Sequence, residues 1–355
     1  MMKKRFLIFA LTAYSLCLSF LAGCQGSEAS PPVSESPAPP VQTAAPDLPG
    51  DTLPSGTASP EATKQPAPTE TAIPDSSTPM SETALRDNTP VCLVPTADQT
   101  AETHNDAAAI DYSHAADGYI MARYFGSSPK VKMQIKGPDH VTYTYNLISS
   151  DFVAFPLSAG DGSYDVAIYE NISGTSYLTC LTTQISVTLT SEFGPYLYPN
   201  QYCSFSADSE TVAKASELAK GAACDLDVVS AVYNYIISSI TYDYDKASTV
   251  PSGYTADVDE ILEKGTGICL DYAAVMTSML RSQRIPTRLE VGYAGDAYHA
   301  WISTYITDIG WVNGIVEFDG KSWELMDPTF AASSSEKELR KFIGDGSNYV
   351  VKYMY

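Results

Sequence analysis

Residues 25–90 constrain the fold of this 355-residue chain more than any other stretch. They contain fourteen of its 23 prolines, together with many Ser, Thr and Ala residues, and no aromatic residue. Such a segment cannot bury enough apolar surface to form a core. We therefore predict that residues 24–100 form a disordered stalk and that the fold lies after it. At about 3.1 Å per residue, the proline-rich part could extend to roughly 200 Å.

The first 23 residues have the pattern of a secretion signal. Met1 to Arg5 is basic, and residues 6–20 form an apolar run that is too short to span a membrane as a stable helix. The next four residues, Leu21-Ala22-Gly23-Cys24, resemble the bacterial lipobox, in which cleavage precedes a cysteine that is then acylated. We expect a lipoprotein signal peptide over 1–23, lipidation at Cys24 and an extracytoplasmic protein anchored to the bacterial cell membrane. An ordinary secretion signal with an incidental Cys24 is the alternative.

Residues 101–195 show the alternation that is typical of short β-strands. Val131, Met133 and Ile135 are apolar and alternate with polar residues, and turns that contain Gly or Pro separate the runs. Six or seven such strands predict a small β-sandwich of the immunoglobulin-like type. Because no cluster of polar residues stands out here, we expect a spacer or docking module.

Residues 196–355 change from a period of two to one of nearly four. Helix caps, apolar stripes and Gly or Pro ends predict helices, which antiparallel strands then follow. Helices packed on an antiparallel sheet give an α+β fold. The expected helices cover about 209–220, 225–240 and 258–264 and begin again at Cys269; the expected strands cover 287–294, 299–306 and 347–355, and a hairpin turn at Asp319-Gly320 joins two more.

Cys269 is the candidate nucleophile. It follows a turn marked by Gly265 and Gly267 and stands at the start of an apolar helix. The unpaired N–H groups and the positive end of the helix dipole at such a position favour thiolate over thiol. A cysteine enzyme also needs a base for the thiol proton and a carboxylate or amide that orients the base.

His299 and Asp327 are the candidates for these two roles. His299 is the sole histidine of residues 196–355, because the others fall in or beside the predicted sandwich, at His104, His114 and His140. Asp327 follows in Trp323-Glu-Leu-Met-Asp327-Pro-Thr329, where Asp-Pro-Thr is also ordinary turn chemistry. Asp296 is a weaker rival, since it lies only three residues before His299 and is expected in a loop.

These motifs resemble those of the transglutaminase-like superfamily. The segment around Cys269 and Tyr272, Gly-Ile-Cys-Leu-Asp-Tyr-Ala, resembles its nucleophile motif, and His299-Ala-Trp301 resembles its histidine strand. Residues 323–329 resemble its terminal Trp-x-x-x-Asp-x-Thr strand. The resemblance implies a papain-like core.

The resemblance also implies roles and a reaction. Cys269 would be the nucleophile, His299 the general base and acid, and Asp327 the residue that orients it; Tyr272 and Trp301 are expected to shape the site. The implied reaction is acyl transfer, in which a thiolate attacks an amide carbonyl, ammonia or an amine leaves, and an amine or water resolves the thioester.

The sequence departs from the animal members of this superfamily in two respects. It has one upstream sandwich in place of flanking barrel domains, and it lacks an Asp-x-Asp-x-Asp-Gly type loop for calcium. We therefore predict no metal and no cofactor. The Cys269 N–H is a candidate oxyanion donor, but no aromatic residue before it can be matched to the second donor of the family.

The resemblance identifies candidate catalytic residues but does not identify the substrate. Bacterial members include peptidases, so a cysteine peptidase or amidase that acts on wall peptide or secreted protein is an alternative to a crosslinking enzyme. A non-catalytic surface module that keeps the fold for binding is a second alternative, although nothing in a scaffold demands Cys269, His299 and Asp327 together.

Cysteine number and net charge limit the remaining possibilities. Without Cys17 and Cys24 five cysteines remain, so one stays unpaired in a monomer, as a nucleophile requires. Pairing among the other four stays open, namely Cys92, Cys180, Cys203 and Cys224. A net charge of −21 argues against nucleic acid as a partner. We expect a protein or peptide substrate at the cell surface and a membrane contact through the lipid at Cys24.

Overall fold

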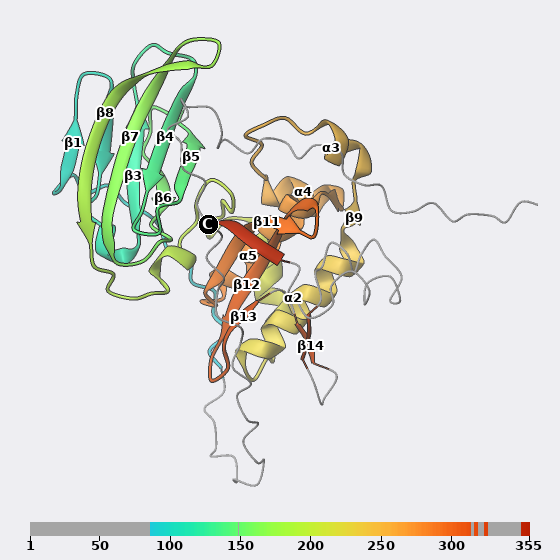
Figure 1. The fold of residues 1–355 in the computed structure, drawn as a ribbon. Coiled ribbons are helices and arrows are strands. Elements are labelled where there is room, and N and C mark those ends of the chain that lie inside the picture. The colour runs from blue at the N-terminus through green and yellow to red at the C-terminus, as the bar shows by residue number, and fades with distance from the viewer. Residues whose placement is uncertain (1–85, 148, 314–315, 319–322, 326–348) are drawn as a thin grey trace, which may run out of the picture. The chain divides into compact units, whose positions relative to one another are not determined.

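The computed structural model describes residues 86–147, 149–313, 316–318, 323–325 and 349–355. All of them belong to one compact unit. Helices and antiparallel sheets both occur (Figure 1), so the predicted α+β class is confirmed. Within these residues, no helix is both long and apolar enough to cross a membrane.

The first part of the described chain forms two four-stranded antiparallel sheets (Figure 1). Their buried residues contribute to one core, and the alternation on β4 shows why, because Val131, Met133 and Ile135 are buried and the residues between them are not. One sheet has the order β1 (Glu102–His104), β2 (Ala108–Asp111), β3 (Tyr119–Tyr124), β6 (Val153–Pro156); the other has the order β5 (Thr142–Asn146), β4 (Val131–Lys136), β7 (Gly162–Ser173), β8 (Ser176–Val187). Two 3-10 helices, η1 (Ala115–Asp117) and η2 (Gly194–Tyr196), flank them in the chain.

Five α-helices follow between residues 210 and 282. Local capping defines their ends, as in α4, where the Asp257 side chain accepts a hydrogen bond from the Glu260 N–H at 3.0 Å and Gly265 ends the helix in the left-handed conformation. The helices are α1 (Glu210–Leu218), α2 (Asp225–Ser239), α3 (Tyr244–Thr249), α4 (Val258–Lys264) and α5 (Cys269–Ser282).

A four-stranded antiparallel sheet follows these helices and forms, with them, the second half of the described chain, from residue 210 onward. Its order is β13 (Gly310–Asn313), β12 (Ala297–Ile306), β11 (Thr287–Ala294), β16 (Tyr349–Met354). Gly292 permits the close approach of β16, since a Cβ at this position would lie 2.0 Å from the Val350 carbonyl oxygen. Two short pairs are parallel β9 (Thr241–Tyr242) with β10 (Thr266–Gly267) and antiparallel β14 (Val316–Phe318) with β15 (Trp323–Leu325). The predicted turn at Asp319-Gly320 lies outside the described residues.

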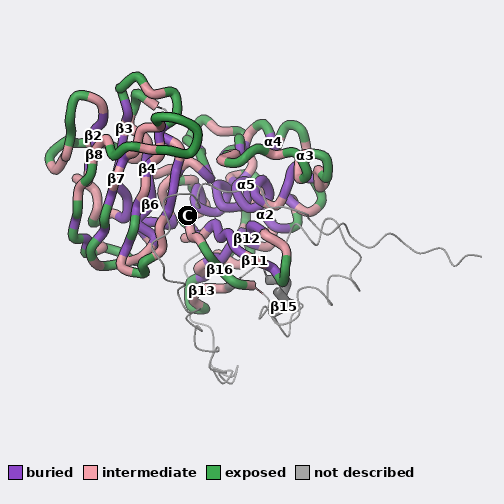
Figure 2. Tube along the Cα trace, turned by 45° about the horizontal axis from the view of Figure 1, so that its top comes forward, coloured by how far each residue is buried: buried purple, intermediate pink, exposed green. Residues whose placement is uncertain are grey.

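Helix α5 is the central element of this half. It contacts β11 and β12 of the sheet, and also α1, α2 and α4. Thirteen of its fourteen residues are buried (Figure 2), and the exception is Cys269. The helix is therefore buried along nearly its whole length, and its first two residues, Cys269 and Leu270, line a cavity.

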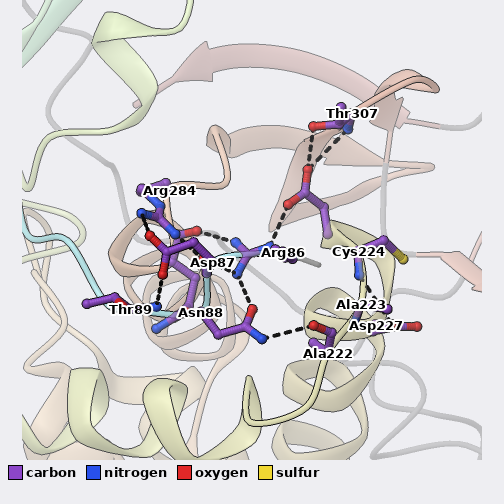
Figure 3. A network of polar contacts seen from close by, with 12 residues as sticks. Arg86, Asp87, Asn88, Thr89, Ala222, Ala223, Cys224, Asp227, Arg284 and Thr307 are labelled. Carbon is purple, nitrogen blue, oxygen red and sulfur yellow. Dashed lines mark hydrogen bonds and ion pairs between the residues drawn. The ribbon is translucent and has the colours of Figure 1, made fainter. Parts of the chain in front are cut away.

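Residues 86–91, which we call the anchor segment, bind the opposite end of α5 and the start of α2 (Figure 3). The Arg86 Nε donates to the Asp225 carboxylate at 2.8 Å, and its Nη2 donates to the Gln283 carbonyl oxygen. The Asn88 Nδ2 donates to the Ala222 carbonyl oxygen at 2.9 Å, and the Val91 N–H donates to that of Ser282 at 2.8 Å. The structure thus places ordered contacts at residues 86–100, within the range predicted as stalk, because polar side chains can fix a segment that has no apolar core of its own.

Candidate active site

Cys269 is the first residue of α5. The turn before it is fixed by the Asp271 carboxylate, whose Oδ2 accepts a hydrogen bond from the Ile268 N–H at 2.9 Å. Gly267 allows this approach, because a Cβ there would lie 2.7 Å from the Asp271 Cβ. The thiol is partly exposed, as a nucleophile must be.

His299 lies on β12 and is 4% exposed. It pairs in register with Gly292 of β11, so its position is set by the centre of the sheet and not by a loop. His299 and Cys269 line the same cavity, which has a volume of about 50 Å³. The structure therefore brings together two residues that are thirty positions apart in the sequence.

The cavity is apolar apart from these two side chains and the hydroxyls of three tyrosines. No Asp, Glu, Lys or Arg is among its described lining residues, which are Tyr242, Ala247, Val250, Pro251, Tyr254, Ile268, Cys269, Leu270, Val291, Tyr298, His299 and Ala300. Burial raises the pKa of the Tyr298 hydroxyl, so this side chain is a neutral hydrogen-bond donor near the thiol.

The other predicted site residues are placed differently. Trp301 is buried, and its ring stacks on that of His299 with centroids 6.2 Å apart, but it does not line the cavity. Tyr272 is fully buried and donates a hydrogen bond to the Ile240 carbonyl oxygen at 2.6 Å, which ties α5 to the end of α2. Asp327 and Cys24 lie outside the described residues. The rival Asp296 is exposed in the turn between β11 and β12.

A partly buried ion pair lies next to Cys269, in which the lysine side chain is 27% exposed and the carboxylate is fully buried. Asp271 is fully buried, and its Oδ2 lies 2.5 Å from the Lys246 Nζ. The Tyr254 hydroxyl donates to Asp271 Oδ1 at 2.7 Å, and the Lys246 ammonium lies 2.7 Å from the same hydroxyl and 4.5 Å from the centre of the Tyr254 ring. Burial and the neighbouring Asp271 charge raise the pKa of the Tyr254 hydroxyl, which keeps its proton available for this bond.

Sequence reasoning missed Lys246, Tyr254 and the buried role of Asp271. One signal was available, because an acidic residue at the third helical position is the usual partner of a helix N-terminus. No sequence signal pairs Asp271 with Lys246, which lies 25 positions earlier in a segment without clear periodicity. Among the described residues, no group of three or more His, Cys, Asp or Glu side chains could hold a metal ion.

The comparison with protein families agrees with this geometry. Residues 212–314 match the family model of the transglutaminase-like superfamily. The resemblance predicted from the motifs is thereby confirmed, and the matched region contains Cys269 and His299 but ends before Asp327. No curated protein matches the chain.

Three solved structures match the chain at low identity. One is a candidate cysteine protease from Cytophaga hutchinsonii, with 16% identity, a TM-score of 0.31 and coverage of 65% of this chain and 69% of that one. A candidate protease from Parabacteroides distasonis has 10% identity, a TM-score of 0.25 and coverage of 58% and 63%. Red sea bream transglutaminase has 14% identity, a TM-score of 0.25 and coverage of 61% and 48%, so the alignment spans about half of that enzyme.

Proposed function

We propose that this protein is a thiol enzyme that transfers or hydrolyses acyl groups at protein or peptide amides, with Cys269 as nucleophile, His299 as base and acid, and Asp327 as the orienting carboxylate. The observation that carries the proposal is the shared cavity of Cys269 and His299 inside the region that matches the superfamily. A partly exposed cysteine at a helix start, facing a buried imidazole, is the arrangement that nucleophilic thiol catalysis needs.

The proposed reaction has two steps. In the first, His299 takes the Cys269 proton, the sulfur bonds to the amide carbon, and the C–N bond breaks as the nitrogen leaves with that proton. In the second, an amine or a water molecule attacks the thioester carbon, His299 takes its proton, and the C–S bond breaks to return the thiol. The N–H groups of Asp271 and Tyr272 already donate to the Ile268 carbonyl oxygen, so the N–H of Cys269 itself is the candidate donor that stabilises the intermediate oxyanion.

The cavity favours an uncharged acyl group. A carboxylate or an ammonium would lose its hydration there without an oppositely charged partner among the described lining residues. A carboxamide can use the Tyr298 hydroxyl as a hydrogen-bond partner, whereas that of Tyr254 is already bound to Asp271 and Lys246. We therefore propose a glutamine-like or apolar acyl donor, in preference to an acidic or basic one.

The test is incubation of the purified protein with a glutamine-containing protein and a labelled primary amine. Incorporation of the label supports acyl transfer, and cleavage or deamidation without label supports hydrolysis, which is the peptidase or amidase alternative. Cys269→Ala and His299→Ala should each abolish the reaction. Cys224→Ala is the matched control, because Cys224 is also a free cysteine at a helix N-terminus, that of α2, but lies outside the cavity.

Two results would count against the proposal. If neither label nor cleavage appears, or if Cys269→Ala retains full activity, a non-catalytic binding module becomes the better account. Iodoacetamide supplies an independent measurement. If His299 activates the Cys269 thiol, the wild type should react rapidly near neutral pH and His299→Ala more slowly. Equally slow rates in the two proteins would favour the non-catalytic binding module.

We also propose that the protein is anchored at the cell surface through a lipid on Cys24. Support comes from the residues alone, namely the basic start, the apolar run and the small residues before Cys24. Growth with a labelled fatty acid tests it. Label on the wild-type protein and its loss in Cys24→Ser would support the anchor, and release of unlabelled protein into the medium by the wild type would contradict it.

A further inference from the structure

One segment forms a whole wall of the cavity. Residues 242–256 contribute Tyr242, Ala247, Val250, Pro251 and Tyr254 to its lining. The segment leaves the core after β9 and returns at α4, and its short helix α3 has no buried residue. Its apolar side chains Tyr242, Ala247, Val250 and Tyr254 pack against the core but are only partly buried. Polar contacts therefore matter to its attachment, because partial burial favours local opening.

Polar contacts attach the segment at two places: the Asp243 N–H donates to the Gly267 carbonyl oxygen at 2.9 Å, and two side chains farther along bind a buried carboxylate. Lys246 and Tyr254 both come from this segment, and both bind the same fully buried carboxylate, Asp271, through distances of 2.5 and 2.7 Å. Asp271 in turn accepts the hydrogen bond of the Ile268 N–H, which fixes the turn that presents Cys269. A hydrogen-bonded buried charge holds its partners firmly, because breaking either contact leaves an uncompensated charge out of water.

We propose that Lys246, Tyr254 and Asp271 form a positioning network that holds residues 242–256 in place as the wall against which the acyl donor is oriented. This inference rests on the proposed function for the identity of the ligand, but not for the attachment itself. None of the three residues is given a role in bond making. Lys246 and Tyr254 act on the substrate through the wall, and Asp271 alone also contacts the turn before Cys269.

The network makes a specific prediction about kinetics. A small alkylating reagent needs only the thiol and its base, whereas an acyl donor must also be oriented by the wall. A loosened wall should therefore weaken reaction with the acyl donor far more than reaction with iodoacetamide. Misplacement of about 1 Å can cost on the order of a hundredfold in rate, so a loss of about tenfold to a hundredfold in kcat/KM is expected.

The experiment compares the full chain with Lys246→Met, Tyr254→Phe and Lys214→Met. Lys214 is a close match for Lys246, because its ammonium lies 2.6 Å from the Glu217 carboxylate and 5.3 Å from the centre of the Tyr235 ring, yet it is on α1 and outside the cavity lining. Three quantities are measured: kcat and KM for a glutamine-containing peptide, the iodoacetamide rate at Cys269, and hydrogen exchange of residues 244–250. Thermal unfolding verifies that each variant is folded.

Expected results are a raised KM, faster exchange in residues 244–250 and a nearly unchanged iodoacetamide rate for Lys246→Met, with a smaller change of the same kind for Tyr254→Phe and none for Lys214→Met. The inference is overturned if kinetics and exchange are unchanged in Lys246→Met, or if the iodoacetamide rate falls as much as kcat/KM. Should Lys246→Met not fold, Tyr254→Phe decides, because it removes a single hydroxyl. If the wild type itself is inactive, the proposed function fails, and the exchange data alone decide whether the network holds the wall.

Discussion

The two ends of helix α5 each carry a buried charge, but they satisfy it in different ways. At the first turn, the Asp271 carboxylate is paired with Lys246 and Tyr254 from one lightly buried segment. At the last turn, Arg281 is 1% exposed and donates to the carbonyl oxygens of Tyr198, Thr287 and Tyr355, at 2.6, 2.7 and 2.6 Å. One end is joined to a cavity wall, and the other is joined to the backbone of three separate segments.

A cysteine stands at each end as well. Cys269 opens the helix and is partly exposed, whereas Cys203 is fully buried and its sulfur accepts a hydrogen bond from the Arg281 Nη1 at 3.2 Å. The comparison teaches that a neighbouring charge is one condition among several. Of these two cysteines, Cys269 is partly exposed and shares a cavity with a histidine, and these are the conditions that the proposed nucleophile needs.

The largest effect is expected for Arg281→Met. The carbonyl groups of Tyr198 and Thr287 would lose the donors of Arg281, whereas that of Tyr355 keeps the Leu289 N–H. Each buried unsatisfied group costs roughly 1–3 kcal/mol, so the free energy of unfolding should fall by about 3 kcal/mol or more. Urea unfolding measures it. The iodoacetamide rate at Cys269, corrected for the folded fraction, should stay unchanged, and a fall in that rate would mean that the two ends are not separate in function.

A somewhat smaller loss of stability is expected for Asp271→Asn. The amide keeps the shape and one acceptor oxygen but loses the charge that pairs with Lys246, and hydrogen bonds to charged groups contribute about 1.5–3 kcal/mol. Unlike Arg281→Met, this variant should also lower kcat/KM for the acyl donor at temperatures where it is folded. Full activity with reduced stability would assign Asp271 to structure alone.

The two thiols give the next contrast. Burial raises the pKa of the Cys203 thiol, and the Arg281 charge only partly opposes this, so the group stays protonated and inaccessible at pH 8. Cys269 should therefore react with N-ethylmaleimide about tenfold faster or more than Cys203 in the folded protein. Mass spectrometry of peptides from a time course measures both. Equal rates would remove the distinction between the two ends.

The smallest effect is expected for Lys214→Met. The ion pair of Lys214 with Glu217 lies on the surface of α1, where solvent and salt screen it, so the urea midpoint should not change measurably. A clear loss would show that an exposed lysine of this kind matters to stability by itself. The stability lost in Lys214→Met would then have to be subtracted from that lost in Lys246→Met before the remainder is assigned to the contact with Asp271.

The sequence predicted those parts of this comparison that depend on local chemistry. The helix expected at 258–264, its end at Gly265 and the helix that begins at Cys269 are set by neighbours within a few residues, and the structure confirms each. The alternation of β4 and the bounds of β11 were recognisable for the same reason. These features are fixed by the chain's own periodicity.

The missed parts depend on contacts between distant segments. Arg281 binds main-chain carbonyl oxygens, which every residue has, so no side-chain pattern could identify its partners. Lys246 lies in a six-residue helix that is too short for its apolar positions to show a period. Residues 86–89 are polar, and the contacts of Arg86 and Asn88 are with partners more than a hundred positions away.

The anchor segment has a mechanical consequence. Any tension on the chain that precedes Arg86 enters the folded region through the contacts of that side chain with Asp225 and Gln283. These contacts lie at the end of α5, which its fourteen residues separate from Cys269 by about 20 Å. A force applied there would act on the N-terminal end of α2 and the C-terminal end of α5, and not on the cavity where the chemistry is proposed.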